Sequence, residues 1–204
     1  MFDFGGVVTT SPFDAFAEYE VRLGVEVGTI RSINARRPDA NAWARLERGE
    51  IDLAGFVDAF EAEAREVGVE LSGEEVLACL VGRPRPRVVE AVRRCSEHLA
   101  TAIVTNNFRP AGALGSPSDP FDFAGLLDVV DVVVESSVEG VRKPEPAFYL
   151  LALERLGVEP GAAVLLDDLG VNLKPARALG ITTIKVVDPD EALDELGVLV
   201  GLSL

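Results

Sequence analysis

Residues 1–8 read Met1-Phe2-Asp3-Phe4-Gly5-Gly6-Val7-Val8, and this stretch decides the fold. A short apolar run that ends in a glycine turn is typical of a buried strand entering a loop. In an open α/β sheet, ligands bind at that end of a strand, where Asp3 lies. The glycines allow the backbone to approach a ligand closely. Asp3 could equally cap the next helix, and these residues alone favour neither interpretation.

The start of the chain sets one further expectation. Only Met1 and Phe2 precede Asp3, whereas a strand normally has about 5–6 residues. The first strand is therefore expected either to be short or to lack residues that would precede Met1.

The composition limits the class of protein. The 204 residues, 48% of them hydrophobic, fit one large domain or a core with a small insert. A net charge of -15 repels nucleic acid and anionic membranes, so neither is an expected partner. An anionic substrate would need a local positive group or a bound cation. We expect a homodimer only on the base rate for soluble proteins.

The cysteine pattern and the hydropathy indicate the compartment. Cys79 and Cys95 are the two cysteines, and neither lies in a paired metal motif or a disulfide framework. No apolar run is long enough to span a membrane, and none has the form of a signal peptide. We therefore expect a reducing, cytoplasmic setting.

Residues 12–82 are predicted to be helical throughout. Ser11-Pro12 is typical of a helix start, and Ser72-Gly73-Glu74-Glu75 is typical of a capping box. The helices are expected at residues 12–23, 29–36, 39–49, 53–67 and 73–80. This segment is predicted to be a small all-helical cap, inserted after the first strand of a core formed by residues 1–11 and 83–204.

From residue 83 onward, strands and helices alternate. Apolar runs predict strands at residues 99–104, 129–134, 163–166 and 182–187. Helices are expected at 86–97, 143–156, 173–179 and 190–200, and residues 108–122 are expected to form a loop. This alternation indicates an α/β, Rossmann-like, doubly wound parallel sheet with helices on both faces.

At four places, polar side chains lie just after a predicted strand or just before a predicted helix. The groups are Asp3, Thr105-Asn106-Asn107, Lys143, and Asp167-Asp168 with Asn172. The carboxyl ends of parallel strands meet at one edge, so these groups are expected to converge. Carboxylates from separate strands suit Mg²⁺, while lysine, threonine and backbone amides suit an anion. A carboxylate nucleophile beside two positive charges is typical of phosphoryl transfer through an aspartyl-phosphate.

Each of these groups also has a structural interpretation. Asp167 and Asp168 could cap a helix, although adjacent acids repel unless a positive charge lies nearby. Thr105 could bond the next turn, and Lys143 could be a solvated loop residue. The other conspicuous side chains are expected to be structural, with His98 at the surface and apolar packing for Cys79, Cys95 and Trp43.

The motifs occur in a recognisable order. They are Phe-Asp-Phe-Gly-Gly-Val at 2–7, Ile-Val-Thr-Asn-Asn at 103–107, Arg-Lys-Pro-Glu-Pro at 142–146, and Leu-Leu-Asp-Asp at 165–168. This order resembles the haloacid-dehalogenase-like (HAD) hydrolase superfamily over nearly the whole chain. Residues 46–51, 105–108 and 167–177 are most similar to the N-terminal phosphatase-like domain of soluble epoxide hydrolase and of some acyl-CoA dehydrogenases.

The resemblance implies roles for four residues that would contact the substrate. Asp3 would be the nucleophile, and Thr105 would hold the phosphate with help from the amide of Asn106. Lys143 would neutralise both the nucleophile and the substrate.

It also implies a magnesium site. Asp3 and Asp168 would bind Mg²⁺, with Asp167 beside them as a supporting or alternate ligand and the carbonyl of Gly5 facing the metal. Phosphatases of the family usually carry an aspartate two residues after the nucleophile, where this chain has Gly5. That aspartate protonates the leaving group, a contribution typically worth about 10²–10⁴ in rate.

Three functions are therefore open. The leading one is a Mg²⁺-dependent phosphatase acting on a small phosphorylated metabolite. A metal-free haloacid dehalogenase also uses an aspartate nucleophile, but it would leave Asp167 and Asp168 without a neutralising cation. A binding or regulatory protein that keeps the fold without turnover is favoured by Gly5 and by the short first strand.

Overall fold

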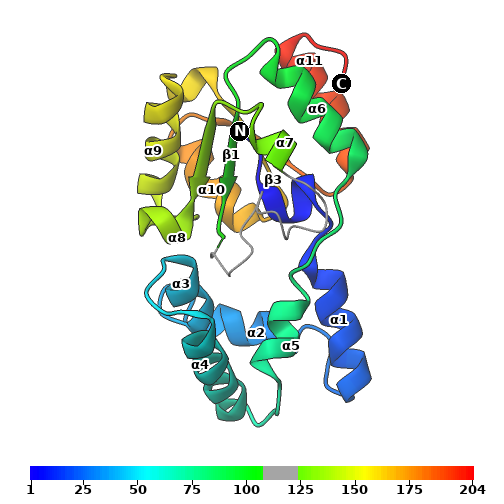
Figure 1. Cartoon of the computed structure of the whole chain (residues 1–204), viewed down its shortest axis with the longest axis vertical. Helices are drawn as coiled ribbons and strands as arrows, with labels where there is room; N and C mark the ends of the chain where they lie inside the picture. Colours follow the sequence, from blue (N-terminus) through cyan, green and yellow to red (C-terminus); the bar gives the residue numbers. More distant parts are fainter. Residues whose placement is uncertain (108–123) are drawn as a thin grey trace.

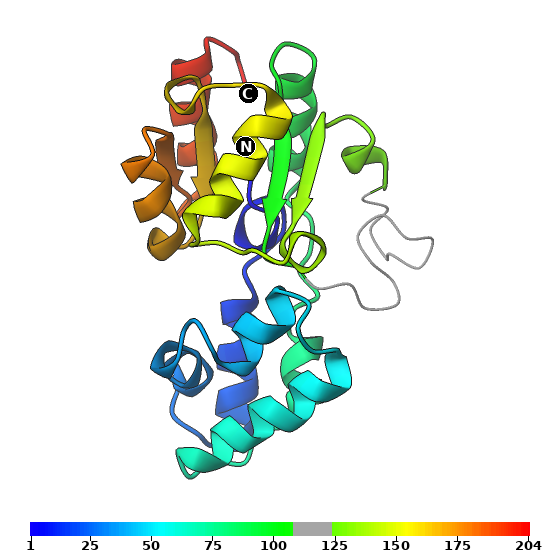
Figure 2. The same ribbon diagram turned by 90° about the vertical axis from the view of Figure 1, so that its left-hand side faces the viewer.

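The structure is a computed structural model that describes residues 1–107 and 124–204 (Figure 1). The predicted loop at 108–122 lies outside the described residues. An α/β core and a group of helices lie at opposite ends of the long axis, which the view turned by 90° also shows (Figure 2). Within the described residues, no helix is both long and apolar enough to cross a membrane.

The core contains a parallel sheet in which the first residues of the chain are central. Its strands are β1 (Ala102–Thr105), β2 (Val132–Glu135), β3 (Val164–Asp167) and β4 (Thr182–Lys185). β1 pairs with β2, and β3 pairs with β4. Phe2 forms parallel bridges to both Ile103 and Leu166. The order across the sheet is therefore β2, β1, residues 1–3, β3 and β4.

The strands begin later than the apolar runs predicted, by one to three residues for β1, β2 and β3. Leu99 belongs to the turn that follows the preceding helix, because its N–H donates to the Cys95 carbonyl at 2.8 Å. Val129 likewise closes a turn by donating to the Leu126 carbonyl at 3.3 Å. Hydropathy does not distinguish an apolar residue in such a turn from one in the strand that follows. β4 begins at Thr182 as predicted but ends at Lys185 rather than at residue 187.

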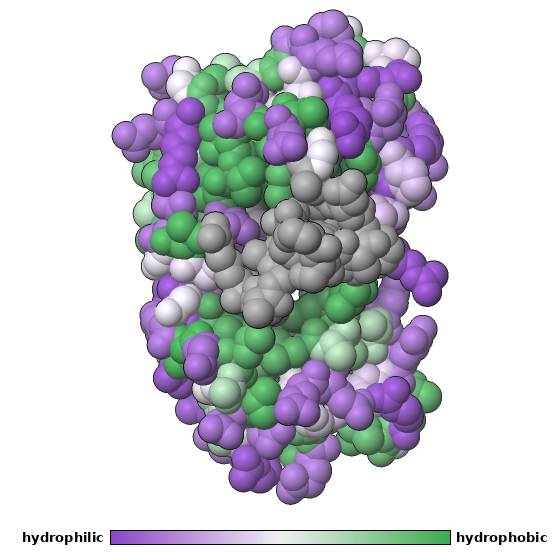
Figure 3. Space-filling model, viewed as in Figure 1, coloured by the Kyte–Doolittle hydropathy of each residue, from purple (hydrophilic) through white to green (hydrophobic). Residues whose placement is uncertain are grey.

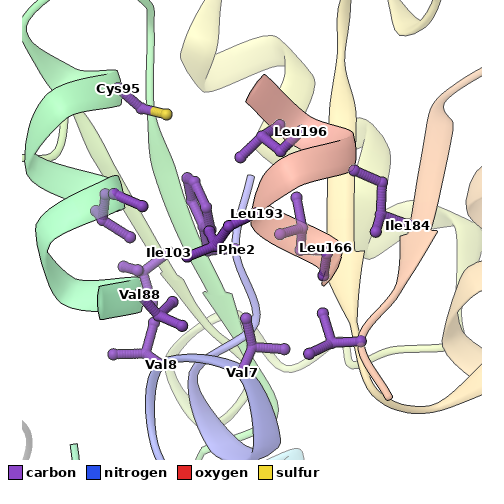
Figure 4. Close-up of a cluster of buried hydrophobic side chains, with 14 of the residues drawn as sticks. Phe2, Val7, Val8, Val88, Cys95, Ile103, Leu166, Ile184, Leu193 and Leu196 are labelled. Carbon is purple, nitrogen blue, oxygen red and sulfur yellow. The ribbon is translucent and has the colours of Figure 1, made fainter. Parts of the chain in front are cut away.

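Helices cover both faces of the sheet, as predicted. One face packs on α6 (Pro86–Ser96) and α11 (Pro189–Val200), with Phe2, Ile103 and Leu166 between them (Figure 4). The other face packs on α9 (Pro146–Leu156) and α10 (Gly170–Ala178). Successive strand residues point to opposite faces, so β1, β2 and β3 each contribute to both apolar clusters. Cys95 packs in the first cluster, as expected.

Within the described part of the core, four short elements were not predicted, and α9 and α10 start elsewhere than expected. The additions are a π-helical turn (Phe4–Val8), α7 (Ala124–Leu127), α8 (Ser136–Glu139) and a 3₁₀ helix (Pro160–Ala162). α9 starts at Pro146 rather than at residue 143, because proline suits a first helical turn. α10 starts at Gly170 rather than at residue 173.

Residues 12–82 contain helices and no strand, as predicted. These helices are α1 (Pro12–Leu23), α2 (Thr29–Arg36), α3 (Ala42–Glu47), α4 (Leu53–Glu66) and α5 (Gly73–Ala78). Asp52 and Ser72 cap α4 and α5 by accepting backbone N–H groups. α3 starts three residues later than predicted, because Asn41 caps it by accepting the Ala44 N–H. We call residues 12–82 the helical segment.

The helical segment has its own apolar core. Trp43 lies 4.6 Å from Phe56 between ring centroids, and Phe56 stacks on Phe60 at 5.5 Å. Trp43 is therefore part of this core, as expected. The two connections to the sheet run side by side, with Thr10 N–H donating to the Arg83 carbonyl at 2.8 Å.

The face shown in Figure 3 carries apolar side chains on both sides of the grey segment, whereas hydrophilic ones dominate the outer ends.

Candidate active site

Asp3 lies at the carboxyl end of the central strand and is 7% exposed. Its Oδ1 accepts the N–H of Phe4 at 2.7 Å, and its Oδ2 lies 2.8 Å from the Lys143 ammonium. Asp3 therefore fits both interpretations of the opening stretch. It caps the turn that follows, and it also faces the edge of the sheet where a ligand would bind.

The two glycines of this turn differ. Gly6 has φ +81°, and a Cβ there would lie 2.2 Å from Oδ2 of Asp168, so only glycine fits. Gly5 has φ −70° and ψ 129°, and a Cβ there would have no neighbour within 4 Å. The backbone requires glycine at position 6 but not at position 5.

Lys143 lies between two carboxylates and is 1% exposed. Its Nζ is 2.8 Å from Asp3 Oδ2 and 2.7 Å from Asp167 Oδ2. Burial disfavours the ammonium, but the two carboxylates outweigh it and raise the pKa of Lys143 above its ordinary value. The interpretation of Lys143 as a solvated loop residue is therefore wrong.

Asp167 is fully buried, and its oxygens accept hydrogen bonds from several donors. Asn172 Nδ2 donates to both oxygens, at 3.0 and 3.1 Å, and the N–H of Leu169 donates to Oδ1 at 2.8 Å. With the Lys143 ammonium, these donors occupy the carboxylate. Tyr149 in turn donates to the Asn172 carbonyl at 2.7 Å and supports this arrangement.

Asp168 is less enclosed than Asp167 and has fewer partners. Its Oδ2 accepts the Ser11 hydroxyl at 3.4 Å. Burial and the neighbouring Asp167 raise the pKa of Asp168 from 3.8 to about 6. Ser11 occupies the N-cap position of α1, as expected, but its side chain makes no cap hydrogen bond there. Its hydroxyl faces the active-site edge instead, a role the sequence analysis missed.

The donor set fits a divalent cation. Asp3, Asp167 and Asp168 each offer an oxygen, and these atoms lie within 4.8 Å of one another. Burial, and then the two neighbouring acids, raise the pKa of Asp3, with Lys143 opposing them. Three carboxylates against one ammonium leave negative charge uncompensated, and carboxylate oxygens are the ligands that Mg²⁺ prefers. The carbonyl of Gly5 as a further ligand stays a prediction.

Thr105 is the last residue of β1, and Asn106 follows it. Thr105 is 5% exposed and pairs with Glu135 of β2. The side chain of Asn106 holds the backbone of Lys143 on both sides, with Nδ2 donating to its carbonyl and Oδ1 accepting its N–H, each at 2.8 Å. The sequence predicted a role for the backbone amide of Asn106, whereas this contact of its side chain was not expected.

The helical segment brings a further charged residue to this edge. Glu47 Oε2 lies 2.6 Å from Arg142 Nε and accepts Asn106 Nδ2 at 3.1 Å. Both Glu47 and Arg142 lie within stretches that carry the family resemblance, but nothing in the sequence indicates that they pair, because they are far apart along the chain.

A cavity of about 470 Å³ lies elsewhere, lined by α10 and the end of β4. Its lining includes Lys174, Arg177 and Lys185 and none of the predicted site residues. We assign the site from its chemistry rather than from the size of a cavity.

Comparison with known proteins gives a match to one family and to several individual proteins. A family model described as haloacid dehalogenase-like hydrolase matches residues 1–180. The chain is 38% identical to mouse acyl-CoA dehydrogenase family member 10, over all of this chain and 19% of that protein. It is 30% identical to pig bifunctional epoxide hydrolase 2, over all of this chain and 39% of that protein. The chain thus spans only a minor part of these two relatives.

Other proteins match over most of their own length. A sesquiterpene phosphatase from Aspergillus oryzae, astK, is 28% identical over 98% of this chain and 95% of that protein. The crystal structure of a HAD family enzyme from Bacteroides thetaiotaomicron, in complex with magnesium and inorganic phosphate, has a TM-score of 0.59 at 19% identity. It covers 90% of this chain and 91% of that one, and shows that the fold is shared.

Proposed function

The chain belongs to the haloacid dehalogenase-like hydrolase family, and on that premise we propose that it is a Mg²⁺-dependent phosphatase acting on a small phosphorylated metabolite. The observation that carries the proposal is the cluster of Asp3, Asp167 and Asp168 around one buried ammonium, that of Lys143. The phosphatase among its relatives and the magnesium–phosphate complex among its structural neighbours support the same chemistry.

The proposed reaction has two steps. An oxygen of Asp3 forms a bond to phosphorus as the bond to the leaving oxygen breaks, and the leaving alkoxide takes a proton from water to depart as the alcohol. Water then attacks the phosphorus of the aspartyl-phosphate, which frees Asp3 and releases inorganic phosphate. Because residue 5 is glycine, neither step has the usual carboxyl group to transfer the proton.

The other residues reduce the charge repulsion between Asp3 and the phosphate. Lys143 neutralises Asp3 and the incoming phosphate, and the hydroxyl of Thr105 and the amide of Asn106 donate to phosphate oxygens. Bound Mg²⁺ would supply a Lewis acid that withdraws charge from the phosphoryl oxygens. Asp3, Asp168 and the carbonyl of Gly5 would hold it.

Asp167 and Asp168 are assigned different tasks. Asp167 already accepts hydrogen bonds from Asn172, Leu169 and Lys143, so we assign it to orienting Lys143. Asp168 has the Ser11 hydroxyl as a weak donor and a raised pKa, which favours it as the carboxylate that meets the metal.

Residues 12–82 are proposed as the cap and residues 1–11 and 83–204 as the core. The place where Thr10 and Arg83 pair supports this boundary, because both connections cross there.

The test is release of inorganic phosphate from an aryl phosphate with Mg²⁺ and with a chelator, using Asp3→Asn as the matched control. We expect turnover only with the metal and only in the wild type. Beryllium fluoride, a phosphoryl mimic, should bind with Mg²⁺ to the wild type and not to Asp3→Asn.

Two results would replace the proposal with an alternative. Chloride release from a 2-chloro acid without metal would indicate a dehalogenase. The second alternative is a binding protein, which the glycine at position 5 favours. Binding of beryllium fluoride without turnover of aryl, alkyl or acyl phosphates would identify such a protein.

A further inference from the structure

Glu47, at the end of α3, is the point where the helical segment reaches the catalytic edge. Its carboxylate pairs with Arg142 at 2.6 Å, and Arg142 Nη1 also donates to the Pro38 carbonyl at 3.0 Å. The side chains of Glu47 and Arg142 are only 16% and 14% exposed. Nearby, Gly49 has φ +69°, and a Cβ there would lie 2.7 Å from the Ser137 carbonyl oxygen. The helical segment and the core are therefore in close contact here.

The same carboxylate also contacts the predicted phosphate-binding stretch. Glu47 Oε2 accepts Asn106 Nδ2 at 3.1 Å, while the Lys143 carbonyl accepts the same amide nitrogen at 2.8 Å. The third bond runs the other way, from the Lys143 N–H to Asn106 Oδ1. The Asn106 side chain thus has two acceptors as neighbours, in Glu47 and the Lys143 carbonyl, and one donor, the Lys143 N–H. Only the amide nitrogen can donate, so these neighbours fix the orientation of the amide group.

We propose that Glu47 is a positioning residue: together with Arg142, it orients Asn106, which clamps the Lys143 backbone and so holds the ammonium between Asp3 and Asp167. The inference deepens the proposed function and rests on it for the role of Lys143. It makes the geometry of the catalytic lysine depend on docking of the helical segment. If α3 moved away, Asn106 would lose one of its three hydrogen bonds.

The chemistry of Glu47 favours this role over simple docking. Burial raises the pKa of Glu47, while Arg142 opposes the shift, so the carboxylate occupies an unfavourable place. A buried ion pair often contributes no more to stability than an apolar pair would. A carboxylate, however, can accept from the arginine and from the asparagine at once, and an apolar side chain cannot.

The first test measures backbone hydrogen exchange by NMR in the metal-free protein. The Lys143 amide donates to Asn106 Oδ1, so it reports directly on the clamp. In Glu47→Ala, we expect this amide to exchange about tenfold faster or more, the result of losing about one hydrogen bond. The Leu166 amide, which donates to the Met1 carbonyl in the sheet, should keep its rate.

Two variants make this test specific. Glu47→Gln keeps an oxygen acceptor for Asn106, so it should recover much of the protection lost in Glu47→Ala. Glu145→Gln is the matched control, because Glu145 pairs with Arg48 at 3.7 Å across the same contact. The hydrogen bonds of the Asn106 side chain go to Glu47 and Lys143 instead. It should leave exchange at Lys143 unchanged. Unchanged exchange in Glu47→Ala, or an equal rise in Glu145→Gln, would overturn the proposal.

The second test is kinetic, with an aryl and an alkyl phosphate. Misplacing Lys143 should lower kcat by about 10²-fold at most, with a smaller effect on KM and the same factor for both substrates. An increase in KM with kcat unchanged would mean that Glu47 contacts the substrate. A larger decrease in kcat for the alkyl phosphate than for the aryl phosphate would mean that Glu47 donates a proton. Either result would overturn the positioning role. If the wild type lacks activity, the proposed function fails, while the exchange test still decides the clamp.

Discussion

The core of the helical segment and the catalytic edge of the sheet are both buried, but they bury opposite kinds of side chain. The helical segment encloses Phe16, Trp43, Phe56 and Phe60 at 8% exposure or less. The catalytic edge encloses Asp3, Lys143 and Asp167 to the same degree. Burial of aromatic groups drives folding, whereas burial of three charges opposes it. The difference fits the proposed function, in which the first region supports the structure and the second carries the chemistry.

The largest expected effect is on catalysis, at Asp3. Asp3→Asn keeps the size of the side chain but removes the nucleophile, so kcat on an aryl phosphate should fall by about 10⁴-fold or more. The melting temperature should hold or rise, because one buried negative charge is lost. Measurements of phosphate release and of thermal unfolding check the expected kcat and the expected melting temperature. A variant that turned over normally would exclude Asp3 as nucleophile.

The opposite pattern is expected in the helical segment. Phe56 is fully buried, so Phe56→Ala should lower the free energy of unfolding by about 3–5 kcal/mol, from lost burial and the cavity left behind. At a temperature where the variant stays folded, Mg²⁺ affinity at the sheet edge should match the wild type. Denaturant unfolding and titration calorimetry give the two quantities. A loss of metal affinity without a loss of stability would erase the contrast between the regions.

The third effect depends on pH and on Asp168. Its folded pKa of about 6 lies above its ordinary value of 3.8, so between these values the folded state holds more protons. Its contribution to the free energy of unfolding therefore falls as the pH rises from about 4 to about 6. In chelator, Asp168→Asn should be as stable as the wild type near pH 4 and more stable at pH 8, by up to about 3 kcal/mol.

Denaturant unfolding at the two pH values measures this difference. Added Mg²⁺ should reverse the order at pH 8, because it stabilises the wild type and not the variant. A variant that binds Mg²⁺ like the wild type in titration calorimetry would remove Asp168 from the ligand set.

The smallest expected effect compares the two glycines. Gly5 has negative φ and open space, so Gly5→Asp should fold normally and restore a proton donor. Its kcat/KM should rise about tenfold more on an alkyl phosphate than on an aryl one, since an alkoxide leaves poorly without a proton. Gly6→Ala should instead lose stability and metal affinity, because its Cβ would collide with Asp168. Equal ratios in a folded Gly5→Asp would mean that residue 5 has no acid role.

Much of the architecture could be predicted because it depends on local pattern. Apolar runs followed by polar residues located the strands, and Ser72 caps the helix for which it was proposed. Strand starts were misplaced at Leu99 and Val129, where backbone hydrogen bonds assign apolar residues to turns. Local pattern also located Asp3, Lys143, Asp167 and Asp168, since each follows a strand or precedes a helix.

The sequence by itself determined which polar groups lie close together, because the carboxyl ends of parallel strands always lie at the same edge of the sheet. Only the tertiary structure decided which partners each of these groups contacts. Asp167 accepts hydrogen bonds from Lys143 and Asn172. Asp168 accepts one from Ser11. Glu47, in the helical segment, pairs with Arg142 and accepts a hydrogen bond from Asn106. Such pairings depend on distances of a few ångströms between residues far apart in the chain, and no local pattern records them. The freedom at Gly5 and the constraint at Gly6 likewise follow from the backbone angle and the neighbouring atoms.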